Sequence, residues 1–374
     1  MILTDDQRQI ADMAKSFLAE EGTIAKQLRH WRDIGCKDGF GHDLWKQMAE
    51  LGLTGLAVPE AEGGLGLGAT EAALVMEEVG RNLTPSPFLT TALVAVEAMK
   101  GTEQGKHWFP GIVAGETVAA IAVDEGPHHR PRQIALRAER SGNGFALSGT
   151  KQFVVHGASA DVILVAARTS GSAGESDGLT LFAVPREAAG MTVENVALTD
   201  SSKAARLTFD KVAVDADAVI GEVDGGWEPL RRAMRLGRTG AAAEMVGAAG
   251  GAMTMTVDYL RQRKQFGKLI GEFQVLQHRA AHLFGEIEIA RAATLKAAEL
   301  LDKGDDKAGI MSHVAKAKAG RVATLAVQEG VQMHGGIGMT DEHDIGFYMK
   351  RAKVLDSLFG DSSYHARMVQ VMGA

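Results

Sequence analysis

The sequence predicts an α+β protein whose 374 residues run from helices, through a β-rich middle, back to helices. Three observations support this order. Apolar residues recur at helical spacing near the start, they alternate as in strands from about Val118, and long helical patterns return beyond Gly221. We therefore expect an N-terminal helical domain at 1–115, a middle antiparallel β domain at 116–220 and a C-terminal four-helix bundle at 221–374.

The first helix is predicted from its start signal. Thr4 and Gln7 have the spacing of a capping box. The apolar residues that follow share one helical face: Ile10, Met13, Ala14, Phe17 and Leu18. Further helices are predicted at 42–51 and 69–79. The glycine-rich stretch 59–66 between them has no strand before it, so we interpret it as a connector and not as a phosphate-binding loop.

The middle segment has strand signals. Asn143-Gly144 lies between two alternating stretches and predicts a type I′ hairpin over 134–147. Additional strands are predicted at 162–167, 179–184 and 207–214. In the last segment, one long helix is expected to stop near Lys303-Gly304. Its apolar stripe consists of Leu276, Ala280, Leu283, Phe284 and Ile287.

Composition excludes several classes of function. The formal net charge of −7 provides no basic surface for nucleic acid, and one cysteine, Cys36, excludes an internal disulfide framework. No leader or membrane-spanning stretch is visible, so we expect a soluble cytoplasmic protein. His128-His129 and the 342–344 cluster lack metal-site spacing, and no nucleophile-elbow motif is present. Neither a metal site nor hydrolysis is expected.

Two ordered motifs carry the functional signal. In the first, Arg263 precedes Gln265-Phe266-Gly267, with Gln274 further on; in the second, Gln332 precedes Gly335-Gly336. Arginine offers a planar charged fork for pyrophosphate oxygens, and adjacent glycines allow close approach of the backbone. Glutamine amides can bond adenosine hydroxyls. In the alternative interpretation, the same residues only cap and end helices.

Together these motifs resemble the Arg/Gln-Phe-Gly and Gln-x-x-Gly-Gly segments of the acyl-CoA dehydrogenase family. Weaker similarity covers almost the whole chain, and the family's helix–β–helix architecture agrees with the pattern above. The resemblance implies FAD-dependent α,β-dehydrogenation of acyl-CoA thioesters, with electrons passing to an electron-transfer flavoprotein. It assigns FAD binding to Arg263, Gln265, Phe266, Gly267, Gln274, Gln332, Gly335 and Gly336.

The catalytic base of that family is missing. In many members it is a glutamate just beyond the glycine motif, where this chain has Phe359; in others it precedes an arginine on an earlier helix, where this chain has Gly237. Neither side chain can take a proton, and losing a general base usually costs about 10²–10⁴ in rate. We therefore assign no catalytic residue to this chain.

The predicted β domain departs from the family as well. The family's threonine that reaches the flavin ring is replaced by Val155, which has no hydroxyl. The loop that meets flavin and coenzyme A phosphates is replaced by the basic stretch 126–132, which we interpret either as a phosphate-attracting loop or as a solvated one.

In this family each FAD lies at a dimer interface. One subunit's β domain holds the flavin ring, and its neighbour's arginine and glycine motifs grip the pyrophosphate and adenosine. The retained and lost residues therefore predict the non-catalytic half of a heteromeric, tetrameric enzyme with a shared FAD, whose partner is a catalytic acyl-CoA dehydrogenase subunit. The segments 340–344 and 358–361 resemble the branch that acts on steroid side chains and other bulky acyl-CoA esters.

Two alternatives stay open at this stage. The chain is an active homomeric enzyme with a relocated base, for which Glu244 or Asp361 are the candidates, or it is a flavin-free scaffold. Glu244 lies seven residues, about 10 Å of helix, beyond Gly237, which is far for a base acting on the same carbon.

Overall fold

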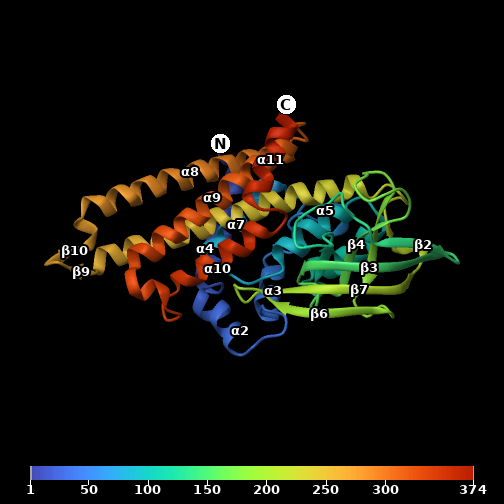
Figure 1. Ribbon diagram of the computed structural model, residues 1–374, viewed down its shortest axis with the longest axis horizontal. Coiled ribbons are helices and arrows are strands. Elements are labelled where there is room, and N and C mark those ends of the chain that lie inside the picture. Colours follow the sequence, from blue (N-terminus) through green and yellow to red (C-terminus); the bar gives the residue numbers. More distant parts are fainter. Residues whose placement is uncertain (1, 374) are drawn as a thin grey trace. The chain divides into compact units, whose positions relative to one another are not determined.

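The computed structural model describes residues 2–373, which form two compact units (Figure 1). A helical unit comprises residues 2–30, 69–85 and 238–373, and a mixed unit comprises residues 31–68 and 86–237. Each unit is assembled from stretches that are distant in the sequence. These units cut across the three segments expected from the sequence, so the three domain boundaries remain a prediction.

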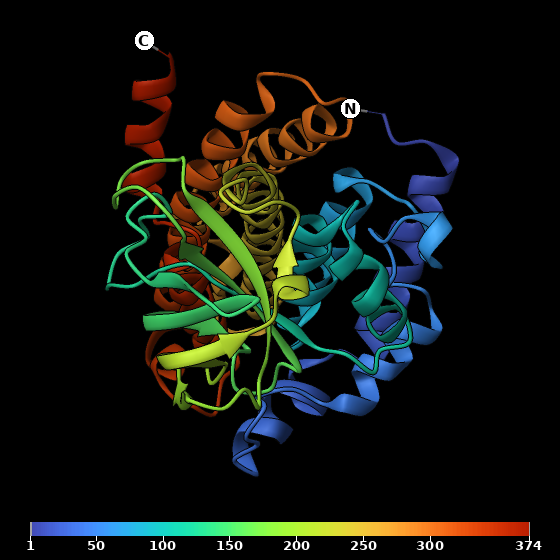
Figure 2. The ribbon, with the colours of Figure 1, turned by 90° about the vertical axis from the view of Figure 1, so that its right-hand side faces the viewer.

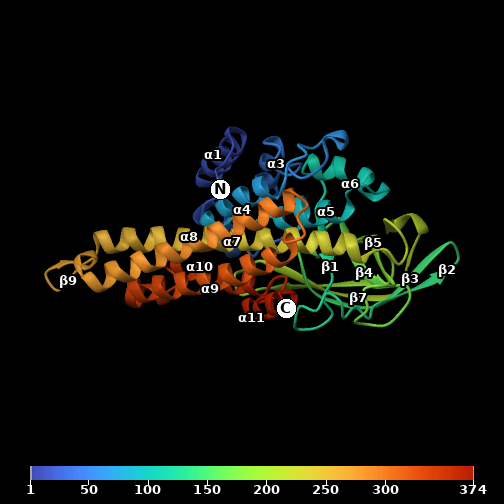
Figure 3. The same cartoon turned by 90° about the horizontal axis from the view of Figure 1, so that it is seen from above.

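The helical unit is built around α9, which packs against α8, α10 and α11, while α4 contacts α1 and α8 (Figure 3). Its helices are α1 (Asp5–Glu20), α4 (Ala69–Asn82), the part of α7 (Trp227–Gln262) that begins at Arg238, α8 (Gln274–Asp302), α9 (Ala308–His334), α10 (Ile345–Ser357) and α11 (Ser362–Gly373). A π-helical turn, Ile24–Arg29, follows α1.

The sequence signals at the ends of these helices are confirmed. At α1 the Thr4 hydroxyl accepts from the Gln7 amide at 3.2 Å, and the Gln7 side chain accepts from the Thr4 amide at 3.1 Å, which completes the capping box. α8 ends at Asp302, and Gly304 follows with a φ of 61°. The predicted apolar stripe of α8 is correct for Leu283 and Ile287 but wrong for Phe284, whose side chain is 55% exposed.

Glycines set the distance between α4 and α7. A Cβ added at Gly80 would overlap the carbonyl oxygen of Glu244, and one added at Gly247 would overlap the carbonyl oxygen of Glu77. The two helix backbones therefore touch where they cross, as only glycine permits. The helical periodicity of the sequence does not predict this contact.

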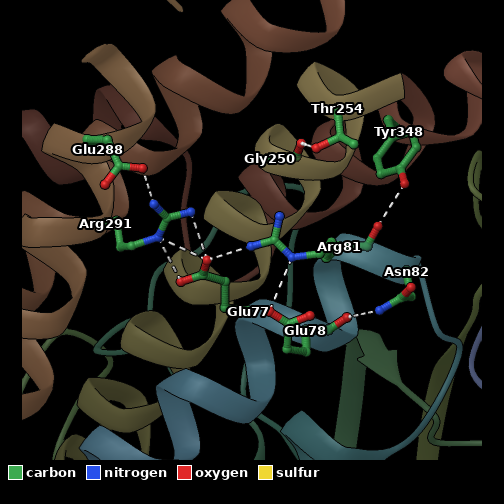
Figure 4. A network of polar contacts seen from close by, with 9 residues as sticks. All are labelled: Glu77, Glu78, Arg81, Asn82, Gly250, Thr254, Glu288, Arg291 and Tyr348. Atoms are coloured by element: carbon green, nitrogen blue, oxygen red, sulfur yellow. Dashed lines mark hydrogen bonds and ion pairs between the residues drawn. The ribbon is translucent and has the colours of Figure 1, made fainter. Parts of the chain in front are cut away.

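A polar network lies beside the crossing (Figure 4). The Glu77 carboxylate is held by Arg81, at 2.9 Å, and by Arg291 of α8, at 2.8 Å. Arg291 also binds Glu288 of its own helix, and the Tyr348 hydroxyl of α10 donates to the Arg81 carbonyl oxygen at 2.7 Å. Charge pairs thus connect α4 with α8, and a hydrogen bond connects it with α10.

The mixed unit contains one eight-stranded sheet, green to yellow in Figure 2, in the order β6-β7-β3-β2-β4-β5-β8 with β1 beside β4. Its pairs are antiparallel except β1–β4 and β2–β4. The strands are β1 (Ala119–Ala122), β2 (Arg137–Ser141), β3 (Gly144–Val155), β4 (Val162–Arg168), β5 (Leu179–Pro185), β6 (Met191–Ala197), β7 (Lys203–Val214) and β8 (Val219–Ile220).

Helices accompany the sheet in this unit: α3 (His42–Glu50), α5 (Val96–Met99), α6 (Glu103–Val113) and the π-helical stretch Leu89–Ala95, with α2 (His30–Asp33) at the unit's edge. The glycine-rich stretch at 59–66 is a connector, with a short 3-10 turn, Glu60–Glu62, followed by Gly63 at a φ of 87°. The predicted strands at 162–167, 179–184 and 207–214 are confirmed.

The predicted type I′ turn at Asn143-Gly144 is wrong by one residue. Ser141 pairs with Gly144, so the turn residues are Gly142 and Asn143, and only Gly142 has a positive φ, at 58°. This is the pattern of a type II′ turn. Gly144 belongs to β3, where a Cβ would overlap the carbonyl oxygen of Val214 on β7. Gly144, which the sequence assigned to the turn, is therefore required for the close packing of β3 against β7.

Candidate functional site

The arginine motif forms a small hairpin between α7 and α8. β9 (Lys264–Gln265) pairs with β10 (Lys268–Leu269), and the two turn residues, Phe266 and Gly267, have positive φ values of 55° and 79°. A bulky residue at positive φ is strained by about 1–2 kcal/mol. The Phe266 ring meets that of Phe273 edge-on at 6.1 Å, but Phe266 is 89% exposed, so little apolar burial compensates for this strain. Such strain at an exposed aromatic residue indicates a functional turn.

Arg263 stands at the base of this hairpin. Its backbone is fixed, because its amide donates to the Tyr259 carbonyl at 2.9 Å and its carbonyl accepts from the Ile270 amide at 2.9 Å. Its side chain is exposed and makes no hydrogen bond or ion pair with any of residues 2–373. The arrangement presents a charged guanidinium from a rigid support, which suits an anion supplied from outside the chain.

The glycine motif ends α9. Gly335 follows His334 with a φ of 63° and a ψ of −141°, so a side chain there would be strained. No atom lies within 4 Å of the position that a Cβ would take at Gly335 or at Gly336. At Gly338, in contrast, a Cβ would lie 2.9 Å from the Val331 carbonyl oxygen, so that glycine serves internal packing. Gly335 and Gly336 therefore present open backbone to a ligand.

The fold brings the two motifs together, toward the same end of the long helices in Figures 1 and 3. Tyr259, one turn before Arg263, has its ring 4.5 Å from that of His334, which directly precedes Gly335. Tyr259 and His334 are not among the site residues predicted from the sequence, because only the fold brings their rings together. All of the predicted FAD-binding residues are exposed: Arg263, Gln265, Phe266, Gly267, Gln274, Gln332, Gly335 and Gly336.

This donor set fits the phosphate and adenosine end of a dinucleotide. A guanidinium without a partner suits pyrophosphate oxygens, and open glycine backbone admits close approach. The amides of Gln274, at the first turn of α8, and Gln332, near the last turn of α9, are available for ribose hydroxyls. A carboxylate would repel phosphate, and none of the predicted binding residues carries one.

Position 359 lies in a rigid turn after α10. Phe359 has a φ of 59° and is 7% exposed. The buried Lys316 ammonium of α9 donates to the carbonyls of Leu355, Asp356 and Gly360 at 2.8, 3.0 and 3.0 Å. Burial lowers the pKa of Lys316 to about 7, while the nearby Asp356 and Asp361 carboxylates oppose that shift. The turn around position 359 is thus held by a buried lysine, and position 359 itself carries no carboxylate.

The two candidates for a relocated base have other partners. The Glu244 carboxylate accepts from Arg351 of α10 at 2.6 and 2.7 Å, and its side chain is only 2% exposed. Asp361 accepts from the Tyr364 amide at 2.7 Å and so caps the start of α11. Both carboxylates have structural tasks, Glu244 as a buried partner of Arg351 and Asp361 as a helix cap.

In the mixed unit, β3 ends at the position expected to face a flavin ring. Val155 is 9% exposed and apolar. His156 follows with a φ of 58°, and its Nδ1 lies 3.0 Å from the Thr90 hydroxyl. The ring of His156 also meets Phe40 edge-on, with centroids 5.6 Å apart. This strand end is occupied by the chain's own packing.

Most side chains of the basic loop at 126–132 are exposed, as the interpretation as a solvated loop expects, but the base of the loop is held by internal contacts. The Asp124 carboxylate receives hydrogen bonds from the His129 ring at 2.8 Å and from the Arg130 amide at 2.9 Å, and His129 is buried. The Arg132 guanidinium stacks over the Trp227 ring at 5.1 Å. The negative charge of the Asp124 carboxylate at the base of the loop lowers the attraction of the loop for phosphate.

Residues 2–373 also bear on metal binding and on membrane insertion. That part of the chain has no group of three or more His, Cys, Asp or Glu side chains placed to hold a metal ion. None of its helices is long and apolar enough to cross a membrane.

Comparison with known proteins gives matches over nearly the whole chain. Three acyl-CoA dehydrogenase family models match the chain: the N-terminal domain at residues 4–116, the middle domain at 125–212 and the C-terminal domain at 224–371. The cyclohex-1-ene-1-carbonyl-CoA dehydrogenase of Geobacter metallireducens is 31% identical over 379 residues, covering 98% of this chain and 97% of that protein.

Two solved assemblies have the same fold. A variant of the Tcur3481-Tcur3483 steroid ACAD is 30% identical with a TM-score of 0.88, over 98% of this chain and 97% of that one. The ChsE4-ChsE5 complex from Mycobacterium tuberculosis is 25% identical with a TM-score of 0.87, over 99% and 97% of the two chains. With matching family models over nearly its whole length and the site geometry described above, this chain belongs to the acyl-CoA dehydrogenase family.

Proposed function

We propose that this chain is the non-catalytic subunit of a heteromeric acyl-CoA dehydrogenase, in which it binds the pyrophosphate and adenosine of an FAD whose ring lies in a partner subunit. The observation that carries the proposal is a contrast between two sets of residues. The predicted nucleotide-gripping residues are intact and exposed, whereas the positions for a catalytic base hold Gly237 and Phe359.

The exposed grip supports binding across an interface. Arg263 has no ion-pair partner among residues 2–373, and Phe266 is held outward by a strained turn. A strained turn that holds a phenylalanine outward, next to a guanidinium with no partner in the described chain, is the arrangement expected of a surface that a ligand or partner covers. A neighbouring subunit with bound dinucleotide would cover both.

The base positions support a non-catalytic role. The side chain at 237 is a hydrogen atom, and the one at 359 is a buried aromatic ring in a turn pinned by Lys316. Glu244 is bound by Arg351, and Asp361 caps a helix. A catalytic base must reach the substrate and exchange a proton with it. Neither the ion pair of Glu244 nor the capping hydrogen bond of Asp361 favours this.

The chain's own residues then have limited and definite roles. Arg263 neutralises pyrophosphate charge, the backbone at Gly335 and Gly336 lies against phosphate or ribose, and Gln274 and Gln332 bond ribose hydroxyls. When bound, FAD supplies the acceptor for the hydride that leaves the β-carbon of the acyl group. The α-proton must go to a carboxylate of the partner, because this chain places none at either base position.

The proposed substrate is a bulky acyl-CoA ester such as a steroid side-chain thioester, and the proposed assembly is a tetramer of two chains of each kind. Two similar solved structures bear the names of paired chains, and one is a steroid ACAD. Reoxidation by an electron-transfer flavoprotein and a cytoplasmic location complete the proposal.

Expression of this chain alone and together with an acyl-CoA dehydrogenase encoded beside it tests the proposal. The chain alone is expected to purify without flavin absorbance and to show no turnover. The pair is expected to copurify with FAD and to oxidise an acyl-CoA with a dye or electron-transfer flavoprotein as acceptor.

Full flavin occupancy and turnover by the chain alone would overturn the proposal in favour of a homomeric enzyme. Assemblies that contain the chain but no flavin would identify a scaffold. An Arg263→Gln variant in the coexpressed pair separates these cases further, since it should lower the flavin content without preventing copurification.

A further inference from the structure

Three aromatic rings connect the two nucleotide-gripping motifs. The ring of His334 lies 4.5 Å from that of Tyr259 on α7 and 4.4 Å from that of His343, in the segment 340–344 that follows the glycine motif. Tyr259 and His343 meet edge-on at 6.2 Å. We call Tyr259, His334 and His343 the ring cluster. None of its members belongs to the predicted nucleotide-contacting set.

The cluster is attached directly to both motifs. The Tyr259 carbonyl accepts from the Arg263 amide at 2.9 Å, so Tyr259 holds the backbone of the arginine. His334 is bonded to Gly335 through the chain itself. A shift between the Tyr259 and His334 rings would therefore change the distance between the guanidinium and the open glycine backbone.

The segment that carries the third ring, that of His343, is held in place by Arg29. Arg29 binds the Asp344 carboxylate at 2.6 Å and donates to the carbonyls of Asp341 and Glu342 at 3.0 and 3.2 Å. Its guanidinium also lies over the Phe347 ring at 4.6 Å. The segment that carries His343 is consequently held at several points, and the ring cluster closes the connection to α7 and α9.

We propose that the ring cluster positions the two motifs for the dinucleotide, and that uptake of a proton by His334 releases it, so that FAD retention weakens in acid. This inference rests on the proposed function for its FAD-binding part. Its structural part, an acid-sensitive spacing between the hairpin and the glycine segment, stands independently.

The surroundings of His334 explain the sensitivity to a proton. Its Nδ1 lies 2.7 Å from the Gly330 carbonyl oxygen, which requires the proton of the neutral ring to be on Nδ1. Its Nε2 is buried without a hydrogen-bond partner among the described residues. A second proton would therefore create a buried charge with no acceptor, beside His343. Such a charge is costly unless the ring moves toward water.

The direction of the shift agrees with this geometry. Burial lowers the pKa of His334, the bond to Gly330 opposes that shift, and His343 adds to it. The charged groups on the packed elements are Asp258, Arg261 and Arg263 on α7 and at its end, Glu329 on α9, Asp341, Glu342 and Asp344 in the segment, and Arg29 and Lys350, which pair with Asp344 and Asp341.

A histidine whose pKa is lowered in the ordered state stabilises that state. This stabilisation is complete when the pH lies above the ordinary pKa of histidine, near 6.5, and it is lost as the pH falls. One such proton weakens binding by up to about tenfold at one pH unit below that value. We therefore expect FAD to bind up to about tenfold more weakly at pH 5.5 than at pH 8.

The spacing can be measured without FAD or a partner. Spin labels at Lys264→Cys on the hairpin and Thr340→Cys on the segment, in a Cys36→Ser background, report the distance by pulsed electron paramagnetic resonance. The wild-type cluster should give a narrow distribution at pH 8 and a broad one at pH 5.5. His334→Phe, which keeps a ring but cannot take a proton, should stay narrow at both.

Two further variants separate positioning from simple stability. His334→Ala removes the ring and should give a broad distribution at both pH values. His282→Phe, an exposed histidine on α8, is the matched control and should behave as the wild type. A wild-type distribution that does not change with pH, or a His334→Phe variant that broadens in acid as the wild type does, would overturn the proposal.

The functional arm measures FAD dissociation from the copurified assembly at the same pH values. Retention should weaken in acid for the wild type and remain constant for His334→Phe. If the spacing changes with pH but FAD retention does not, the link to binding is refuted. If no assembly binds FAD at any pH, the proposed function fails, while the distance measurement still decides whether the ring cluster responds to a proton.

Discussion

Glu244 of α7 and Arg351 of α10 form an ion pair in which one carboxylate oxygen accepts from two guanidinium nitrogens, at 2.6 and 2.7 Å. The glutamate side chain is 2% exposed and the arginine side chain 21%. The carboxylate proposed as a relocated base is thus a charged link between two helices. Its removal should therefore affect stability and leave the chemistry unchanged.

A Glu244→Gln variant is expected to lower the free energy of unfolding by about 2–3 kcal/mol, because it leaves the buried end of Arg351 without its anion. Turnover per folded assembly should not change. Urea unfolding and acyl-CoA oxidation measure the two effects. Glu20→Gln, an exposed position of α1, is the control and should alter neither. A folded variant with turnover reduced by 10²-fold or more would make Glu244 the base.

Asp361 can be tested by a substitution that keeps its structural role. Its Oδ1 accepts from the Tyr364 amide, and asparagine caps a helix as well as aspartate does. Asp361→Asn should therefore preserve both stability and turnover, whereas Asp361→Ala should cost about 1 kcal/mol of stability. Loss of turnover in the asparagine variant, with normal thermal unfolding, contradicts the assignment of Asp361 as a cap.

Lys316 predicts a pH dependence of stability. Its pKa falls from 10.5 to about 7 on burial, so between these values the unfolded chain holds a proton that the folded chain does not. The free energy of unfolding should therefore rise with pH in this window, by up to about 1.4 kcal/mol per pH unit from this group. Urea unfolding at pH 7.5 and 9 should show a smaller rise for Lys316→Met.

The control for that experiment is Lys318→Met on the same helix. Lys318 is paired with Glu286 and 28% exposed, so the change should leave the pH dependence close to that of the wild type. Equal slopes for wild type and Lys316→Met would show that the buried ammonium does not lose its proton in this range.

The glycine contact between α4 and α7 predicts a large effect of one methyl group. A Cβ at Gly247 would overlap the Glu77 carbonyl oxygen, next to the network of Figure 4. Gly247→Ala is expected to destabilise the chain by about 2–3 kcal/mol, since neither backbone can move away without disturbing its helix. Calorimetry of the purified chain measures the change.

Gly285→Ala is the matched helical control. No atom lies within 4 Å of its added Cβ, so the better helix propensity of alanine should stabilise the chain by about 0.5–1 kcal/mol. If both variants shift stability in the same direction, the helix contact does not depend on glycine.

Arg263 offers a graded test of the phosphate grip. Arg263→Gln should weaken FAD binding by the assembly by about 10–150-fold, the equivalent of a charged hydrogen bond of 1.5–3 kcal/mol. Arg263→Lys keeps the charge but not the planar fork of the guanidinium. Its assembly should therefore bind FAD more weakly than the wild type and more tightly than Arg263→Gln. Fluorescence titration of the stripped assembly measures both. Glutamine and lysine variants that bind as tightly as wild type would exclude a role for the guanidinium.

Much of this molecule could be predicted from local patterns in the sequence. Thr4 and Gln7 are three residues apart, and that spacing is enough to specify a helix start. The order of Arg263 before the Gln332 and Gly335 motif indicated the family, because each motif is contiguous in the sequence. Strand alternation similarly located most of the sheet. It missed the short strands β1 and β8, and β6, whose side chains are mostly exposed.

Other features required the tertiary structure. Gly144 suggested a turn, but its close contact with Val214 on another strand moved the turn by one residue. The pairing of Glu244 with Arg351 and the stacking of Tyr259 on His334 join residues 107 and 75 positions apart. Periodicity describes which face a residue occupies on its own helix. Which residue of another helix it meets depends on how the helices cross, and only the folded chain determines that.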